Sequence, residues 1–131
     1  MLVWGTANPE GLSESYNGLY FRGSDVTHAF SDIIGTPVKI EHKGVDVGHV
    51  VSAFPNNGKL DIVIKIDNRV VEGAIISELV RNGTCKEFSL GYSAQITASS
   101  NGEDIVGRKK IQEVSLVRKG ARDKCLIHGF V

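Results

Sequence analysis

The chain has 131 residues, in which 15 Lys and Arg residues balance 15 Asp and Glu residues, so its formal net charge is zero. This length predicts one domain, residues 1–131, that can bury a hydrophobic core without disulfide bonds. The lack of a basic excess argues against a general nucleic-acid binder, and no apolar run approaches the roughly 20 residues that cross a bilayer. We therefore expect neither nucleic acid nor a membrane as a partner.

The first third of the chain mixes short strands with one helix. Residues 2–7 favour a strand, which a cluster of turn residues ends. Residues 12–23 are polar with scattered aromatic side chains, and they form a loop or a short strand. Residues 25–34 predict a short amphipathic helix, because apolar side chains recur at helical spacing between a capping residue and a glycine.

The next segment is typical of a meander of strands. Residues 37–41 and 46–54 are predicted strands, with Lys43 and Gly44 starting the turn between them. Residues 55–58 end in Asn-Gly, which tolerates the positive φ angles of a tight hairpin. Residues 59–66 alternate apolar and polar side chains, as a strand with one buried face does.

The remaining elements are one helix and further strands. Residues 68–82 carry Val70, Val71, Ala74, Ile75, Leu79 and Val80 at helical spacing, followed by Gly83 as a helix end. Strand-like runs then cover residues 87–97, 104–110 and 111–119, of which the last two can form one long strand, and an apolar tail covers 125–131. Together the elements predict an α+β domain: an antiparallel β-barrel of about seven strands with two or more flanking helices.

Ser89 is a candidate nucleophile in the strand at residues 87–97. A serine is a weak nucleophile at neutral pH unless a base lies within hydrogen-bond reach and a third group holds that base. Ser89 shares a strand face with Gly91, which leaves space for the backbone of a substrate. The pattern alone favours the ordinary alternative, in which Ser89 lies on the polar face of a half-exposed strand.

The candidate base is a histidine, the side chain that titrates nearest neutral pH. His42 ends a predicted strand just before a glycine-containing turn, a place where a structural or solvated histidine is common. The local pattern gives no stronger claim to His28, His49 or His128.

Glu113 is an acidic residue inside a predicted strand. Charged side chains are rare in strand interiors and costly to bury without a partner. His42 is an attractive partner, and Lys110 or Arg118 would also serve.

Other chemistry has less support from the sequence. Cys85 and Cys125 lack CxxC spacing and suit a reducing compartment as free thiols, and nothing nearby marks either as an activated nucleophile. The histidines show no metal-ligand spacing, and phosphate-binding glycine loops are absent. We expect no metal and no cofactor.

Three runs together resemble the capsid maturation serine proteases of herpesviruses, the assemblin family, and the related prohead proteases of tailed phages. Residues 37–50 are similar to the family's strand, catalytic histidine, turn and Val-Gly-x-Val stretch. The run Phe-Ser-Leu-Gly-Tyr at residues 88–92 is similar to the nucleophile strand, especially in its phage form. Residues 113–122 resemble the run that opens with the third triad member and ends in Gly-Arg-Arg in herpesviruses. The order of the three runs is that of the family.

The resemblance implies one serine protease domain over residues 1–131, with Ser89 as nucleophile, His42 as base and Glu113 as third triad member. Herpesvirus enzymes carry a histidine at the third position, whereas phage-type enzymes carry a glutamate. A carboxylate can take this role, because the role is to orient the base and stabilise its imidazolium form.

The resemblance also implies an oxyanion hole in the turn at Gly120, Ala121 and Arg122. In the family the first Arg of Gly-Arg-Arg gives a backbone N–H, and the second holds a water through its side chain. Ala121 N–H and the Arg122 side chain take those roles here. The missing first Arg side chain is tolerable because only its N–H is used.

The function that the resemblance implies is a viral capsid maturation endopeptidase that cleaves the scaffold protein and its own precursor. A homodimer is allowed, although this chain is expected to lack most of the C-terminal helices that form it in herpesviruses. The site of action is the host nucleus, inside the immature capsid, or the bacterial host cytoplasm for a phage enzyme. The alternative is a non-catalytic β-barrel that binds a protein partner in capsid or scaffold assembly, with Ser89, His42 and Glu113 apart or engaged in structural hydrogen bonds.

Overall fold

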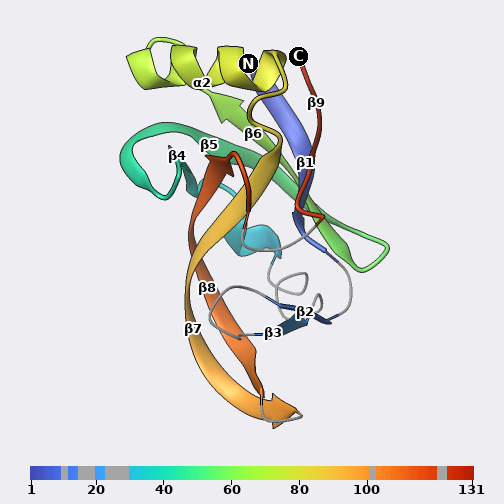
Figure 1. Cartoon of the computed structure of the whole chain (residues 1–131). Helices are drawn as coiled ribbons and strands as arrows, with labels where there is room; N and C mark the ends of the chain where they lie inside the picture. Colours follow the sequence, from blue (N-terminus) through green and yellow to red (C-terminus); the bar gives the residue numbers. More distant parts are fainter. Residues whose placement is uncertain (10–11, 15–19, 23–29, 101–102, 121–123) are drawn as a thin grey trace.

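A computed structural model of the chain describes residues 1–9, 12–14, 20–22, 30–100, 103–120 and 124–131. Most of these residues lie in one curled sheet, with a helix over one end (Figure 1). The described strands are β1 (Leu2–Asn8), β2 (Leu12–Glu14), β3 (Tyr20–Arg22), β4 (Pro37–Ile40), β5 (Lys43–Asn56), β6 (Lys59–Ile66), β7 (Glu87–Ser100), β8 (Glu103–Val117) and β9 (Ile127–Phe130).

The sheet curls into a half-barrel, which confirms the predicted barrel-like shape, but it is mixed, so the predicted antiparallel pairing is wrong. Its strand order is β2-β3-β8-β4-β5-β6-β1-β9, with β7 also paired to β8. Strands β4 and β8 run parallel, with Ile40 opposite Leu116, and β3 and β8 are parallel as well. A hydrophobic pattern shows which face of a strand is buried but not which strand lies beside it, so this pairing between distant segments could not be read from the sequence.

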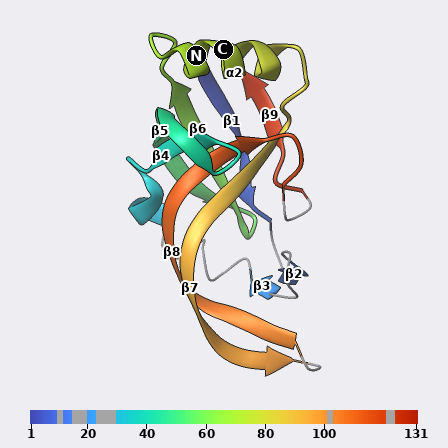
Figure 2. The ribbon, with the colours of Figure 1, turned by 60° about the vertical axis from the view of Figure 1, so that its left-hand side comes forward.

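Strands β7 and β8 form a long antiparallel ribbon that curls away from the rest of the sheet (Figure 2). The segments predicted at 104–110 and 111–119 are indeed one strand, β8. Close to the body of the sheet, β8 lies between β7 and β4, which places the two strands that carry Ser89 and Glu113 beside the strand that leads to His42. The three candidate residues thus come from adjacent parts of one sheet.

Helix α2 (Val71–Arg81) is the only α-helix within the part of the chain that the structure describes. It confirms the helix predicted at 68–82, but its buried face consists of Gly73, Ile76, Ser77 and Val80, while Val71 and Ile75 are exposed. The helix lies so close to the preceding loop that a Cβ atom on Gly73 would be 2.1 Å from the Asp67 carbonyl oxygen. Gly73 therefore lies on the buried face of the helix, where a larger residue would not fit.

The helix predicted at residues 25–34 is described only from Phe30 to Ile33, where the chain forms a short 3-10 helix. Residues 25–29 of that prediction lie outside the described residues. The expected two or more flanking helices therefore reduce to one α-helix and one 3-10 helix in the described ranges. No helix among them is long and apolar enough to cross a membrane.

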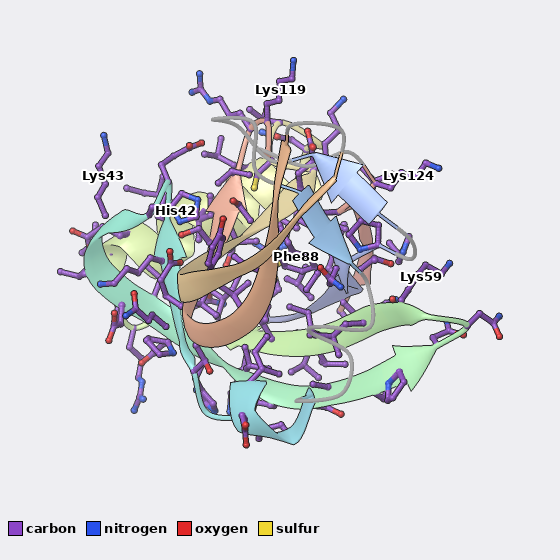
Figure 3. The ribbon with its side chains drawn as sticks, turned by 90° about the horizontal axis from the view of Figure 1, so that it is seen from below. His42, Lys43, Lys59, Phe88, Lys119 and Lys124 are labelled. Atoms are coloured by element: carbon purple, nitrogen blue, oxygen red, sulfur yellow. The ribbon has the colours of Figure 1, made fainter. Side chains whose placement is uncertain are left out.

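The hydrophobic core lies on the concave side of the curled sheet. The alternation predicted for β6 is confirmed, since Leu60, Ile62, Ile64 and Ile66 are all buried. Phe88 of β7 is fully buried next to Ser89 in sequence, and Figure 3 shows it towards the middle of the molecule. Burial of each large aliphatic or aromatic side chain contributes about 1.5–3 kcal/mol to stability. The core fixes β7 with its apolar face inward and leaves its other face for the candidate site.

Candidate active site

His42 lies in a two-residue turn between β4 and β5. Ile40 pairs with Lys43, so Glu41 and His42 are the central residues of the turn. Both have positive φ angles, 51° and 62°. The turn predicted at Lys43 and Gly44 is therefore wrong: the chain reverses earlier, at two residues that carry side chains.

This conformation is strained, because a left-handed backbone costs a residue with a Cβ atom roughly 1–2 kcal/mol. Hydrogen bonds to the end of β8 oppose that cost. The Glu41 N–H donates to the Leu116 carbonyl at 3.2 Å, and the His42 N–H donates to Ser115 Oγ at 2.9 Å. The Arg118 N–H donates to Glu41 Oε1 at 3.0 Å. The turn is thus fastened to the strand that carries Glu113.

The three predicted triad residues form a continuous hydrogen-bonded array. His42 Nε2 lies 2.8 Å from Ser89 Oγ, and His42 Nδ1 lies 2.5 Å from Glu113 Oε1. An ionised carboxylate only accepts hydrogen bonds, so Nδ1–H donates to Glu113 and the lone pair of Nε2 faces the hydroxyl of Ser89. This is the arrangement in which a histidine can take a proton from a serine.

Glu113 reaches His42 by lying across Gly91. The two residues are opposite one another in the β7–β8 ladder, and a Cβ atom on Gly91 would be only 1.9 Å from Glu113 Oε1. The sequence-based interpretation, in which Gly91 leaves room for a substrate, is therefore wrong. The glycine makes room for the carboxylate of the triad.

The site is open at the histidine and covered at the acid. The His42 side chain is 41% exposed, whereas that of Glu113 is 12% exposed. Figure 3 shows His42 close to the β7–β8 ribbon. A substrate can thus approach Ser89 and His42, while solvent has little access to the carboxylate of Glu113 behind them.

Within the described residues, the structure gives no support to the alternative partners of Glu113 or to the other histidines as the base for Ser89. Arg118 contacts the turn through its backbone N–H, and Lys110 has no described side chain. His49 is exposed on β5, and His128 lies 3.0 Å from Thr6 Oγ1 on β1. His28 lies outside the described residues.

The predicted oxyanion hole falls only partly within the described chain. The Gly120 N–H donates to Glu87 Oε1 at 3.3 Å, so this donor is already engaged. Ala121 and Arg122 lie outside the described residues, and their role stays a prediction.

The two thiols are poorly suited to act as nucleophiles. Both are buried, with Cys85 Sγ donating to the Val117 carbonyl and Cys125 Sγ to the Ala7 carbonyl. Burial raises the pKa of the Cys85 thiol to about 11, so it is protonated at neutral pH. Among the residues that the structure describes, no three His, Cys, Asp or Glu side chains gather to hold a metal ion.

A cleft of roughly 520 Å³, which no sequence pattern indicated, lies beside the His42 turn. Ile40 and Glu41 form one wall, and Leu79 of α2, Cys85 and Arg118 form the others. Neither Ser89 nor His42 lines it. The cleft is therefore a neighbour of the triad and not part of it.

Sequence comparison finds no matching family model and no matching curated protein. Structural comparison finds Kaposi's sarcoma-associated herpesvirus protease in complex with a hexapeptide phosphonate inhibitor, with a TM-score of 0.62 and 15% identity. That match covers 96% of this chain and 63% of the other. The same protease in complex with an allosteric inhibitor matches with a TM-score of 0.54 and 19% identity, over 97% of this chain and 76% of that one.

The chain has a herpesvirus-protease-like fold. At these identities the likeness concerns the fold alone. The chain spans 63% of the length of the first of these proteases, so the activity and partners of that whole protein are a matter for proposal. The non-catalytic alternative predicted that Ser89, His42 and Glu113 lie apart or are engaged in structural hydrogen bonds. The distances between them contradict the first of these two outcomes.

Proposed function

We propose that this chain is a serine endopeptidase of the viral capsid maturation type, with Ser89 as nucleophile, His42 as base and Glu113 as the residue that orients the base. The observation that carries the proposal is the array in which His42 lies 2.8 Å from Ser89 Oγ on one side and 2.5 Å from Glu113 on the other. The herpesvirus-protease-like fold supports the same proposal, because the solved structures that share this fold are proteases.

The reaction follows from the direction of the hydrogen bonds. Ser89 Oγ attacks the carbonyl carbon of the scissile peptide while its proton moves to His42 Nε2. The resulting imidazolium is stabilised by the carboxylate of Glu113 at Nδ1. His42 then gives the Nε2 proton to the leaving amine, which departs and leaves an ester on Ser89. A water molecule, deprotonated by His42, hydrolyses that ester and regenerates the serine.

Stabilisation of the oxyanion is assigned to the predicted donors, Ala121 N–H and the Arg122 side chain. Such donors are worth about 10²–10³-fold in rate in serine proteases. The bond from Gly120 N–H to Glu87 holds the chain directly before them.

The proposed substrates are the scaffold protein of an immature capsid and the precursor of the protease itself. A homodimer remains a candidate assembly. The proposed site of action is the immature capsid in the host nucleus, with the bacterial host cytoplasm as the corresponding site for a phage enzyme.

The direct test is cleavage of the precursor or the scaffold protein by wild-type protein and by Ser89→Ala. We expect Ser89→Ala and His42→Ala to lose about 10⁶-fold in kcat, and Glu113→Gln to lose less, about 10⁴-fold. Undiminished cleavage by Ser89→Ala would rule out the proposed nucleophile.

A further inference from the structure

A buried hydroxyl outside the triad joins two of its parts. Ser115 follows Glu113 by two residues on β8, so both side chains are on the same face of the sheet. It is fully buried. Its Oγ donates to Glu113 Oε2 at 2.7 Å and accepts the backbone N–H of His42 at 2.9 Å. One oxygen atom thus contacts the acid of the triad and the backbone of the base.

The direction of these hydrogen bonds is fixed. A backbone N–H can only donate, so Ser115 Oγ must be the acceptor from His42 and has its own proton free for another partner. That proton goes to Glu113 Oε2. The other oxygen of Glu113 then accepts from His42 Nδ1–H, which leaves the Nε2 lone pair for Ser89. The backbone amide of His42 therefore fixes the direction of the Ser115 bond, and the acceptor-only carboxylate of Glu113 fixes the direction of the bond from His42 Nδ1–H.

Ser115 also restrains the part of the site that is most strained. His42 has a φ angle of 62°, and its backbone N–H donates to the side chain of Ser115 on β8 rather than to a backbone carbonyl. Among the described residues, loss of this bond leaves the backbone of the turn held to the end of β8 through Glu41, and His42 itself held to β8 through its Nδ1 bond to Glu113. The ring of His42 is 41% exposed, so surrounding side chains alone do not fix it.

We propose that Ser115 is a positioning residue of this site, which holds the backbone of His42 and the carboxylate of Glu113 through one hydroxyl so that Nε2 faces Ser89. The proposal rests on the proposed function, since it concerns the reaction of Ser89. Ser115 does not touch the reacting atoms, and it acts only through its two partners.

Ser77 provides a matched control within the chain. It is 1% exposed, and its hydroxyl also makes two hydrogen bonds, to the Asn68 side chain and to the Gly73 carbonyl. It lies on α2, which carries none of the triad residues. Ser77→Ala therefore removes a buried hydroxyl with the same number of partners but without a link to the base or the acid.

The experiment compares wild-type protein with Ser115→Ala, Ser115→Thr and Ser77→Ala at equal folded fraction. We expect Ser115→Ala to lower kcat about 10- to 100-fold with KM within about two-fold, because the base and acid are displaced while the substrate surface is kept. Ser115→Thr restores the hydroxyl and part of kcat, and Ser77→Ala keeps the wild-type kcat. Should Ser115→Ala not fold, Ser115→Cys gives the same comparison, since a thiol is a weak donor of similar shape.

Amide hydrogen exchange supplies a readout that does not depend on activity. The His42 amide is expected to exchange at least ten-fold faster in Ser115→Ala than in wild-type protein, with no such change in Ser77→Ala. An active wild-type enzyme whose kcat is unchanged by Ser115→Ala, or lowered equally by Ser77→Ala, overturns the inference. A wild-type protein in which Ser89 is inert overturns the proposed function instead, and an unchanged His42 amide exchange rate overturns the positioning role independently.

Discussion

The position of Gly91 allows the triad to be broken without changing any of its three residues. A methyl group at this position would lie 1.9 Å from Glu113 Oε1, 2.5 Å from its Cδ and 2.8 Å from its Cγ. The carboxylate would have to retreat by roughly 1.5 Å to reach ordinary van der Waals separation. We therefore expect Gly91→Ala to displace Glu113 from His42.

The cost falls on activity more than on stability. The atoms that the methyl group would meet are the end of a flexible side chain, which can swing towards solvent without a shift of the sheet. A misplacement of about 1 Å costs about 10²-fold in rate, and loss of the orienting acid costs about 10⁴-fold. We expect kcat/KM for peptide cleavage to fall between these limits, with a thermal unfolding midpoint within a few degrees of wild type.

A double-mutant cycle identifies the route of the effect. If Gly91→Ala acts by displacing Glu113, it should cost little further activity in a Glu113→Ala background. Wild-type activity in Gly91→Ala would refute the reasoning. A full additional loss in the double mutant would show instead that the methyl group obstructs the substrate, as the sequence alone had suggested.

Two further predictions concern other parts of the chain. Burial raises the pKa of Cys85 to about 11, so its thiol stays protonated below that pH. Iodoacetamide at pH 8 should therefore modify Cys85 at least ten-fold more slowly in native than in unfolded protein, as followed by mass spectrometry. Equal modification rates in the two states would contradict the burial of this thiol. In Gly48→Ala the new methyl group would lie 1.9 Å from the backbone carbonyl oxygen of Lys65. A urea titration should therefore show a free energy of unfolding lower by at least about 2 kcal/mol. An unchanged free energy of unfolding would show that β5 and β6 can move apart.

Local sequence patterns predicted the individual strands and helices better than they predicted which strands lie side by side. The alternation in β6 follows from side-chain burial within one segment, which a sequence displays directly. The helical period located α2 but not its buried face, since Val71 and Ile75 are exposed. The parallel pairing of β4 with β8 joins Ile40 to Leu116, and no local pattern carries that information. The mixed sheet could therefore be found only from the structure.

Turn chemistry shows both the strength and the limit of the sequence rules. Asn57 and Gly58 turn with φ angles of 50° and 81°, as the Asn-Gly pair predicts. Glu41 and His42 adopt a similar turn without a glycine, because three hydrogen bonds to the end of β8 offset the strain. The rule that places turns at glycines failed where tertiary contacts hold the chain in a less favoured conformation.

At the site, the resemblance named three residues that the structure places in contact, and it missed the residue that supports them. Ser115 was not singled out, although a serine two residues from Glu113 in an otherwise apolar run is an unusual choice for a buried position. That pattern could have indicated a hydroxyl kept for a hydrogen bond. The sequence predicted space for a substrate beside Gly91, whereas the structure places Glu113 there. This neighbour depends on the register of β7 and β8, which the sequence does not display.

The most direct test of the central claim is the reaction of the protein with a fluorophosphonate probe, followed by peptide mapping of the adduct. A serine made nucleophilic by His42 should form one adduct, on Ser89, in wild-type protein, and none in Ser89→Ala or His42→Ala. Absence of an adduct from wild-type protein that cleaves its substrate, or an adduct on another residue, would contradict the assignment of Ser89, His42 and Glu113 as a catalytic triad.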